Sequence, residues 1–180
     1  KHHGGVAKAD LGKENLGALE KGLPNLLQHV GNITQVYGLP AVVAINRFPT
    51  DTEAELKLVE DKCRELGVNV ALSEVWGKGG EGGVALAKEV VRLCEEPNSF
   101  DFAYSLDMSI EEKIRAIAQK VYHADDINIL PAAMKQLKQL ESLGFGDLPI
   151  CVAKTQYSFS DDQTLLGAPK GFTLTVRNLK

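Results

Sequence analysis

The sequence predicts an α/β fold in which helices cover both faces of a mostly parallel sheet, a three-layer arrangement, followed by a smaller second α/β sub-domain. Residues 39–46 are apolar almost throughout, which is typical of a central parallel strand covered on both faces. A second short apolar run lies at 68–72, and a segment of helical periodicity follows each run. Strand, helix, strand, helix favours parallel pairing through a right-handed crossover, which puts functional loops at the carboxyl ends of the strands.

Helical periodicity also marks residues 13–36, where Gly22 and Pro24 predict a break into two helices, the second starting at Pro24. The other helices of this half lie after each strand, and each should bury one apolar face. The residues predicted on those faces are Leu56, Val59, Cys63 and Leu66 in the first helix, and Val84, Ala87, Val91 and Cys94 in the second.

A connector at 95–107 divides the predicted sub-domains, residues 1–96 and 97–180. Ser109 and Glu112 have the spacing of a capping box and predict the start of a helix. The remaining elements expected here are a solvated turn at 125–126, a helix ending near Gly144, and strands at 149–153 and 172–176.

Composition narrows the class of protein. The chain has 180 residues, 44% of them hydrophobic, enough for one core or two small ones, and its net charge of −4 gives no electrostatic reason to expect nucleic acid or an anionic membrane. No apolar run reaches the roughly 18 residues that span a bilayer.

Three widely spaced cysteines and no signal-peptide pattern predict reduced core cysteines in a cytoplasmic protein. No spacing of His, Cys or acidic residues predicts a metal site.

The loop after the first strand, residues 46–52, holds an amide, a guanidinium, an aromatic ring and a hydroxyl. Phe48 next to Pro49 in an exposed loop suggests a stacking partner, together with Asn46 at the strand end. The structural alternative is a helix cap made by Thr50 or Asp51. A guanine-recognition NKxD motif does not fit, because Pro49 occupies the third position after Asn46.

The loop after the second strand, residues 73–83, contains the chain's only tryptophan, Trp76, and five glycines. Backbone N–H groups freed by such glycines suit anions, although a flexible strand-to-helix connection is the structural alternative. Lys78 is followed by Gly79, so the loop is no Walker A motif. If both loops lie at one sheet edge, Phe48 and Trp76 could enclose a flat heterocycle.

A third polar segment begins at Lys154, directly after the run predicted as a strand. Lys154 could meet a carboxylate or phosphate, and Gln156 or Ser158 could hydrogen-bond a ligand edge. A turn in which Asp161 and Asp162 cap a short helix is the structural alternative.

Together these segments resemble formate–tetrahydrofolate ligase along essentially the whole chain. The matching stretches are KHHGG at 1–5, KENLxALEKGLPNL at 13–26, VVAINRFPTDTEAEL at 42–56, ALSEVWGKGGEGG at 71–83 and LPICVAKTQYSFSDD at 148–162. The resemblance implies a P-loop-NTPase-like sheet and a three-step ligase chemistry, in which ATP phosphorylates formate and the amine of tetrahydrofolate attacks formyl phosphate to give 10-formyltetrahydrofolate.

The resemblance also implies site residues and partners. Phe48 and Trp76 would sandwich the pterin, with Asn46 and Pro49 lining the same pocket. The residues implied next to the nucleotide are Leu72, Ser73, Gly77, Gly79, Gly80 and Lys154. The whole enzyme would use ATP with Mg²⁺ and a monovalent cation, and would form a homotetramer.

The chain departs from the family pattern in having no GxxxxGK[ST] phosphate loop. We therefore expect an internal to carboxyl-terminal domain fragment of the ligase, with no catalytic residue assigned, requiring no cofactor itself, reaching ATP only through the missing domain, and inactive alone. The alternatives are a non-catalytic assembly module and a nucleotide-binding module. Folate binding that depends on Phe48 and Trp76 would exclude both.

Overall fold

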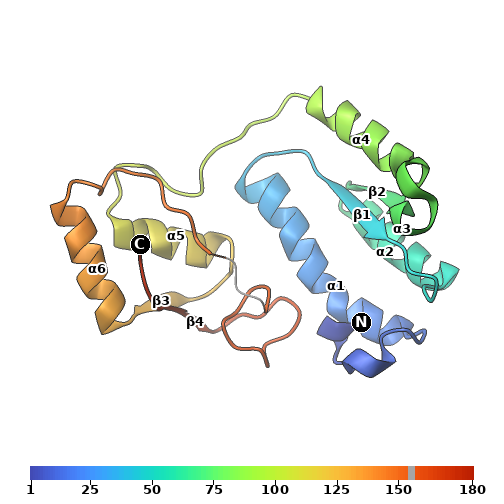
Figure 1. The fold of residues 1–180 in the computed structure, drawn as a ribbon, viewed down its shortest axis with the longest axis horizontal. Coiled ribbons are helices and arrows are strands. Elements are labelled where there is room, and N and C mark those ends of the chain that lie inside the picture. The colour runs from blue at the N-terminus through green and yellow to red at the C-terminus, as the bar shows by residue number, and fades with distance from the viewer. Residues whose placement is uncertain (154–156) are drawn as a thin grey trace. The chain divides into compact units, whose positions relative to one another are not determined.

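The computed structural model describes residues 1–153 and 157–180, which form two compact units, Lys1–Phe100 and Asp101–Lys180. Each unit contains one pair of parallel strands with helices packed on it, as Figure 1 shows. The predicted α/β class and parallel strand pairing are therefore confirmed, and each sheet has two short strands. Among the described residues, no helix combines the length and apolar character needed to cross a membrane.

Unit 1 is built on strands β1 (Val42–Asn46) and β2 (Asn69–Ser73), which pair in parallel from Val42 opposite Asn69 to Asn46 opposite Ser73. Its longer helices are α1 (Leu16–Gly31), α2 (Glu53–Glu65) and α4 (Val84–Cys94). Its short turns are η1 (His2–Gly4), η2 (Lys8–Asp10), η3 (Asn32–Val36), α3 (Val75–Lys78) and η4 (Gly79–Gly83).

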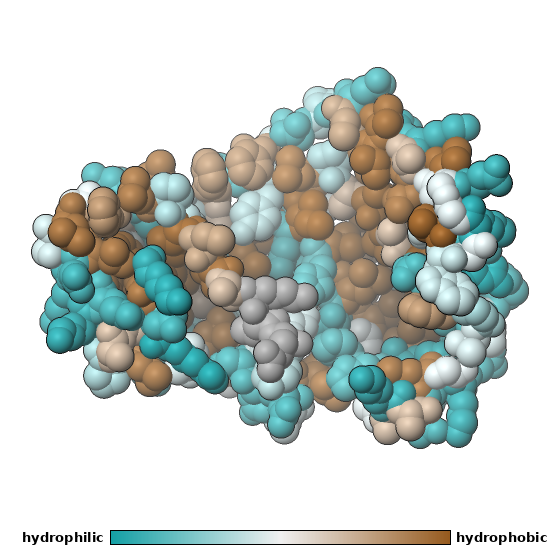
Figure 2. Space-filling model, viewed as in Figure 1, coloured by the Kyte–Doolittle hydropathy of each residue, from teal (hydrophilic) through white to brown (hydrophobic). Residues whose placement is uncertain are grey.

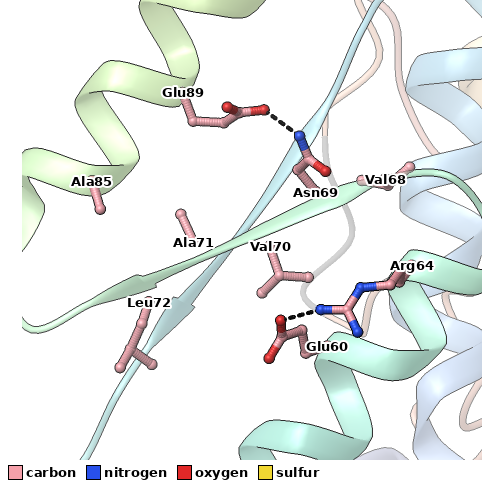
Figure 3. A pocket seen from close by; sticks show the side chains of 9 residues that line it. All are labelled: Glu60, Arg64, Val68, Asn69, Val70, Ala71, Leu72, Ala85 and Glu89. Atoms are coloured by element: carbon pink, nitrogen blue, oxygen red, sulfur yellow. Dashed lines mark hydrogen bonds and ion pairs between the residues drawn. The ribbon is translucent and has the colours of Figure 1, made fainter.

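The core of unit 1 lies on one side of the strand pair. Val30 of α1, Val43 of β1 and Cys63 of α2 meet there with Val68 just before β2. Ala71 points to the opposite side of β2, where α4 packs (Figure 3). Alternate residues of a strand face opposite ways, so α4 packs on the side of β2 that faces away from this core.

Helix α1 does not break at Pro24 as the sequence predicts. It runs without interruption from Leu16 to Gly31 with Pro24 inside. A proline in a helix interior removes one backbone hydrogen bond and costs about 3 kcal/mol. Burial of Ala18, Leu23 and Val30 in the same helix offsets that cost.

The apolar face predicted for α4 is exposed, and the prediction of its burial is wrong. Val84 and Val91 are among the exposed large hydrophobic residues, and Ala87 and Cys94 are exposed as well. Figure 2 shows hydrophobic side chains at the surface in the region of this helix. The prediction that all three cysteines are core residues is also wrong, since only Cys63 is buried and Cys94 and Cys151 are exposed.

Unit 2 is built on strands β3 (Asp126–Ile129) and β4 (Thr173–Val176), which pair in parallel, and on helices α5 (Ile110–Lys120) and α6 (Pro131–Ser142). Its core joins Ala118, Ala124 and Ile127 with partly buried residues of β4. The predicted capping box is confirmed, because Ser109 and Glu112 each bind the other's backbone N–H.

Two predictions in unit 2 are wrong. Asp125 and Asp126 are exposed, as predicted, but they do not form a turn together, because Asp126 begins β3. Residues 149–153 form no strand, although Tyr104 holds this segment through hydrogen bonds between its hydroxyl and the backbone of Ile150.

Among the described residues, each unit buries one charged side chain. In unit 1, Glu55 is 4% exposed; its carboxylate accepts a hydrogen bond from the Asn15 backbone N–H and pairs with Lys1 at 2.9 Å. In unit 2, the fully buried Lys113 donates from Nζ to the carbonyls of Gly146 at 2.6 Å and Leu148 at 3.1 Å.

Candidate functional site

The candidate site lies at the carboxyl ends of β1 and β2. Asn46 and Ser73, the last residues of the two strands, are paired in the sheet, and the Arg47 N–H donates to the Ser73 carbonyl at 3.0 Å. The two loops singled out in the sequence therefore start side by side. Adjacent carboxyl ends of parallel strands are where ligands commonly bind in α/β proteins.

The loop after β1 is closed by Asp51. Its carboxylate accepts the Phe48 N–H at 2.8 Å, and its own N–H donates to the Phe48 carbonyl at 3.0 Å. The cap of the following helix is Thr52, which accepts the Glu55 N–H, so the prediction of Thr50 or Asp51 as the cap is wrong. This closure fixes the Phe48 backbone, and the ring is 59% exposed.

The loop after β2 is closed by a contact between Glu74 and Gly82. The Glu74 N–H donates to the Gly82 carbonyl at 3.0 Å. A Cβ at Gly82 would lie 2.5 Å from the carbonyl carbon and oxygen of Glu74, so only glycine fits there without moving the backbone. Trp76, on the turn that this contact closes, is 80% exposed.

The residues predicted to bind ligands differ in accessibility. Ser73 is buried and Leu72 is half-buried. The exposed ones are Asn46, Phe48, Pro49, Trp76, Gly77, Gly79 and Gly80. Lys154 and Gln156 lie outside the described residues. The structure thus brings the first two loops together and leaves their aromatic rings accessible to a ligand.

Glu74, which was not singled out in the sequence, links charged side chains of the two loops. Lys78 Nζ donates to Glu74 Oε2 at 2.6 Å, Arg47 Nη1 lies 4.0 Å from Glu74 Oε1, and Arg47 Nη2 donates to Glu53 at 2.5 Å. The hydrogen bond from Lys78 is the main cause that lowers the pKa of Glu74. The spacing of four residues between Glu74 and Lys78 is the sequence signal that could have indicated this pair.

A separate pocket of about 360 Å³ follows the outer edge of β2 (Figure 3). Two polar pairs at its rim are already formed, Arg64 with Glu60 and Asn69 with Glu89. Hydrogen bonds from Arg92 and Asn69 lower the pKa of Glu89 to about 2. The lining residues are Glu60, Arg64, Val68, Asn69, Val70, Ala71, Leu72, Ala85 and Glu89.

In the two described stretches, no group of three or more His, Cys, Asp or Glu side chains is placed to hold a metal ion. The residues present therefore do not fit Mg²⁺, and no step through a metal ion is assigned to them.

One comparison with known proteins identifies the family. The model of the formate–tetrahydrofolate ligase family matches residues 1–180, which is the whole chain. Members of that family are ligases of folate one-carbon metabolism that use tetrahydrofolate and ATP. The chain therefore belongs to the formate–tetrahydrofolate ligase family.

Proposed function

We propose that residues 1–180 supply the pterin-binding part of a formate–tetrahydrofolate ligase that makes 10-formyltetrahydrofolate through formyl phosphate. The observation that carries this proposal is the pairing of Asn46 with Ser73, which starts the Phe48 and Trp76 loops side by side. Both rings are largely exposed, and aromatic rings left accessible at strand ends are suited to stacking on a flat heterocycle.

In this proposal Phe48 and Trp76 stack on the two faces of the pterin, while Asn46 and Pro49 line the pocket beside Phe48. Leu72, Ser73 and the loop glycines lie toward the nucleotide. Lys154, which is outside the described residues, stays a prediction from the sequence. The contact between Gly82 and Glu74 gives Gly82 a structural purpose that does not depend on a nucleotide.

The experiment is a titration with tetrahydrofolate followed by the fluorescence of Trp76, the only tryptophan. We expect saturable quenching that Phe48→Ala abolishes. The matched control is Phe145→Ala, which removes another exposed phenylalanine from unit 2 and should leave the quenching unchanged. Equal quenching in all three proteins would contradict stacking between Phe48 and Trp76.

We also propose that this chain alone does not turn over, because its sequence contains no GxxxxGK[ST] loop to hold the phosphates of ATP. The Mg²⁺, the monovalent cation and the tetramer then belong to the whole enzyme in a cytoplasmic setting. An assay for formyltetrahydrofolate formed from formate, ATP and tetrahydrofolate should give no product above the blank. Product at enzymatic rates would contradict this proposal.

A third part of the proposal concerns the sheet. We propose that β1 and β2 belong to a wider, three-layer sheet of the P-loop-NTPase kind, because α2 and α4 flank the outer edge of β2 and leave a groove along it (Figure 3). The Ser73 carbonyl bonds to Arg47 of the loop after β1, so by alternation Val70 and Leu72 direct their backbone groups to the open edge.

Amide hydrogen exchange tests the open edge. The N–H groups of Val70 and Leu72 should exchange faster than that of Ala71, which faces β1. Equal protection at all three positions would show that the edge is already covered in solution.

A further inference from the structure

The charged residues between the two aromatic loops have a fixed geometry. Glu74 follows the last residue of β2, and its carboxylate lies between a cation of its own loop, Lys78 at 2.6 Å, and a cation of the neighbouring loop, Arg47 at 4.0 Å. Its side chain and that of Arg47 are each about 30% exposed, well below Phe48 and Trp76. These two charged side chains are therefore less exposed than the two aromatic rings.

The backbone of Glu74 is held at three points. Its N–H donates to Gly82, and its carbonyl accepts from the N–H groups of Gly77 at 3.1 Å and Lys78 at 2.9 Å. The missing side chain of Gly82 allows this close packing. A carboxylate on so constrained a backbone is preorganised, which lowers the entropic cost of using it to bind a ligand.

The carboxylate keeps acceptor capacity for a ligand. A carboxylate has about four lone-pair sites on its two oxygens. Lys78 takes one site on Oε2, and Arg47 is too far from Oε1 for a hydrogen bond. Among the described residues, Oε1 of Glu74 accepts no hydrogen bond, so both oxygens have a site open to neighbouring donors.

A reduced pterin offers a matching pair of donors. Its aminopyrimidinone ring carries an amino group next to a ring N–H, and the two point the same way along one edge. A carboxylate accepts such a pair in two parallel hydrogen bonds, in the same geometry by which it accepts the fork of an arginine.

We propose that Glu74 is a specificity-determining residue that accepts these two hydrogen bonds from the aminopyrimidinone edge while Phe48 and Trp76 stack on the faces of the ring. This inference rests on the proposed function, because it names the group that orients the same ligand. Arg47 and Lys78 keep Glu74 charged and are positioning residues. Stacking tolerates any flat ring, so the carboxylate supplies the selectivity that the aromatic pair lacks.

The test combines two ligands with two proteins. Tetrahydrofolate and its analogue lacking the amino group of the pyrimidine ring are each titrated against the wild type and Glu74→Gln, with Trp76 fluorescence as the readout. In the wild type the analogue should bind about 10- to 100-fold more weakly, because the carboxylate loses a donor. In Glu74→Gln tetrahydrofolate should weaken by a similar factor, and the difference between the ligands should shrink.

Glu81→Gln is the matched control, since it makes the same change on an exposed glutamate of the same loop and should keep the wild-type difference. A Glu74→Gln protein that weakens both ligands equally would show a merely structural role and overturn the inference. The wild-type ratio between the two ligands needs no variant, so equal affinities there would overturn it even if Glu74→Gln fails to fold. No saturable quenching by tetrahydrofolate in the wild type would instead overturn the proposed function, and this inference with it.

Discussion

Units 1 and 2 both place helices on a pair of parallel strands. In the part of the chain that the structure describes, each also buries one charged side chain, but the two units neutralise that charge differently. Glu55 of unit 1 meets an opposite charge, Lys1, and a backbone N–H. Lys113 of unit 2 meets the carbonyl dipoles of Gly146 and Leu148. The comparison shows two roles for a buried charge. The ion pair in unit 1 connects two side chains, whereas Lys113 holds the backbone of residues 146–148, which has no regular secondary structure.

The largest effect is expected for Lys113, whose buried ammonium is held by backbone carbonyls. Lys113→Met keeps the length of the side chain but leaves two carbonyls without their donor, which should cost about 3 kcal/mol of unfolding free energy. Amide exchange resolved by unit should show the loss in residues 101–180. Lys138→Met, on the exposed side of α6, is the control and should change little. A cost equal to that of the control would mean that the carbonyls find water instead.

A smaller cost is expected in unit 1. Glu55→Gln keeps an acceptor for the Asn15 N–H but loses the charge facing Lys1, which should cost about 2 kcal/mol. Chemical denaturation measures it, with Glu65→Gln on the exposed face of α2 as the control. A larger loss than for Lys113→Met would reverse the comparison between the units.

In Glu55→Gln the free energy of unfolding should also depend less on pH under acid conditions. Burial raises the pKa of Glu55, but the hydrogen bonds from Asn15 and Lys1 outweigh it and leave the pKa below its ordinary value of 4.5. The stabilisation from this ionised carboxylate is therefore fully present above pH 4.5 and is lost as pH falls through the folded-state pKa. Unfolding measured across this range should show a weaker dependence on pH in Glu55→Gln than in the wild type.

The smallest effects concern the helix caps. Ser109 forms both halves of a capping box in unit 2, whereas Thr52 makes one hydrogen bond of 3.3 Å in unit 1. Ser109→Ala should cost about 1 kcal/mol and Thr52→Ala about half of that. Thermal unfolding of the two variants gives the order, and the opposite order would show that the Thr52 cap is tightened by its neighbouring loop.

Structural features that depend on residues close together in the sequence could be predicted from it. The apolar runs located β1 and β2, and Ser109 with Glu112 located the start of α5. The adjacency of the Phe48 and Trp76 loops followed from the crossover rule for parallel strands.

What the sequence could not predict depends on partners far along the chain. Pro24 remains inside a helix because packing of its neighbours offsets its local cost. The polar residue Asp126 begins a strand because β4, more than forty residues later, pairs with it. Glu74 was not singled out, because the charged cluster that it forms depends on Arg47 in the neighbouring loop.

The spacing of the paired strands has a consequence for folding during synthesis. The first residue of β1, Val42, pairs with Asn69, 27 positions later (69 − 42), whereas Asp126 of β3 pairs with Thr173, 47 positions later (173 − 126). Closing the longer loop costs about 0.5 kcal/mol more entropy. Since a chain leaves the ribosome from its amino end, β1 and β2 can pair while the partner of β3 has still to be made.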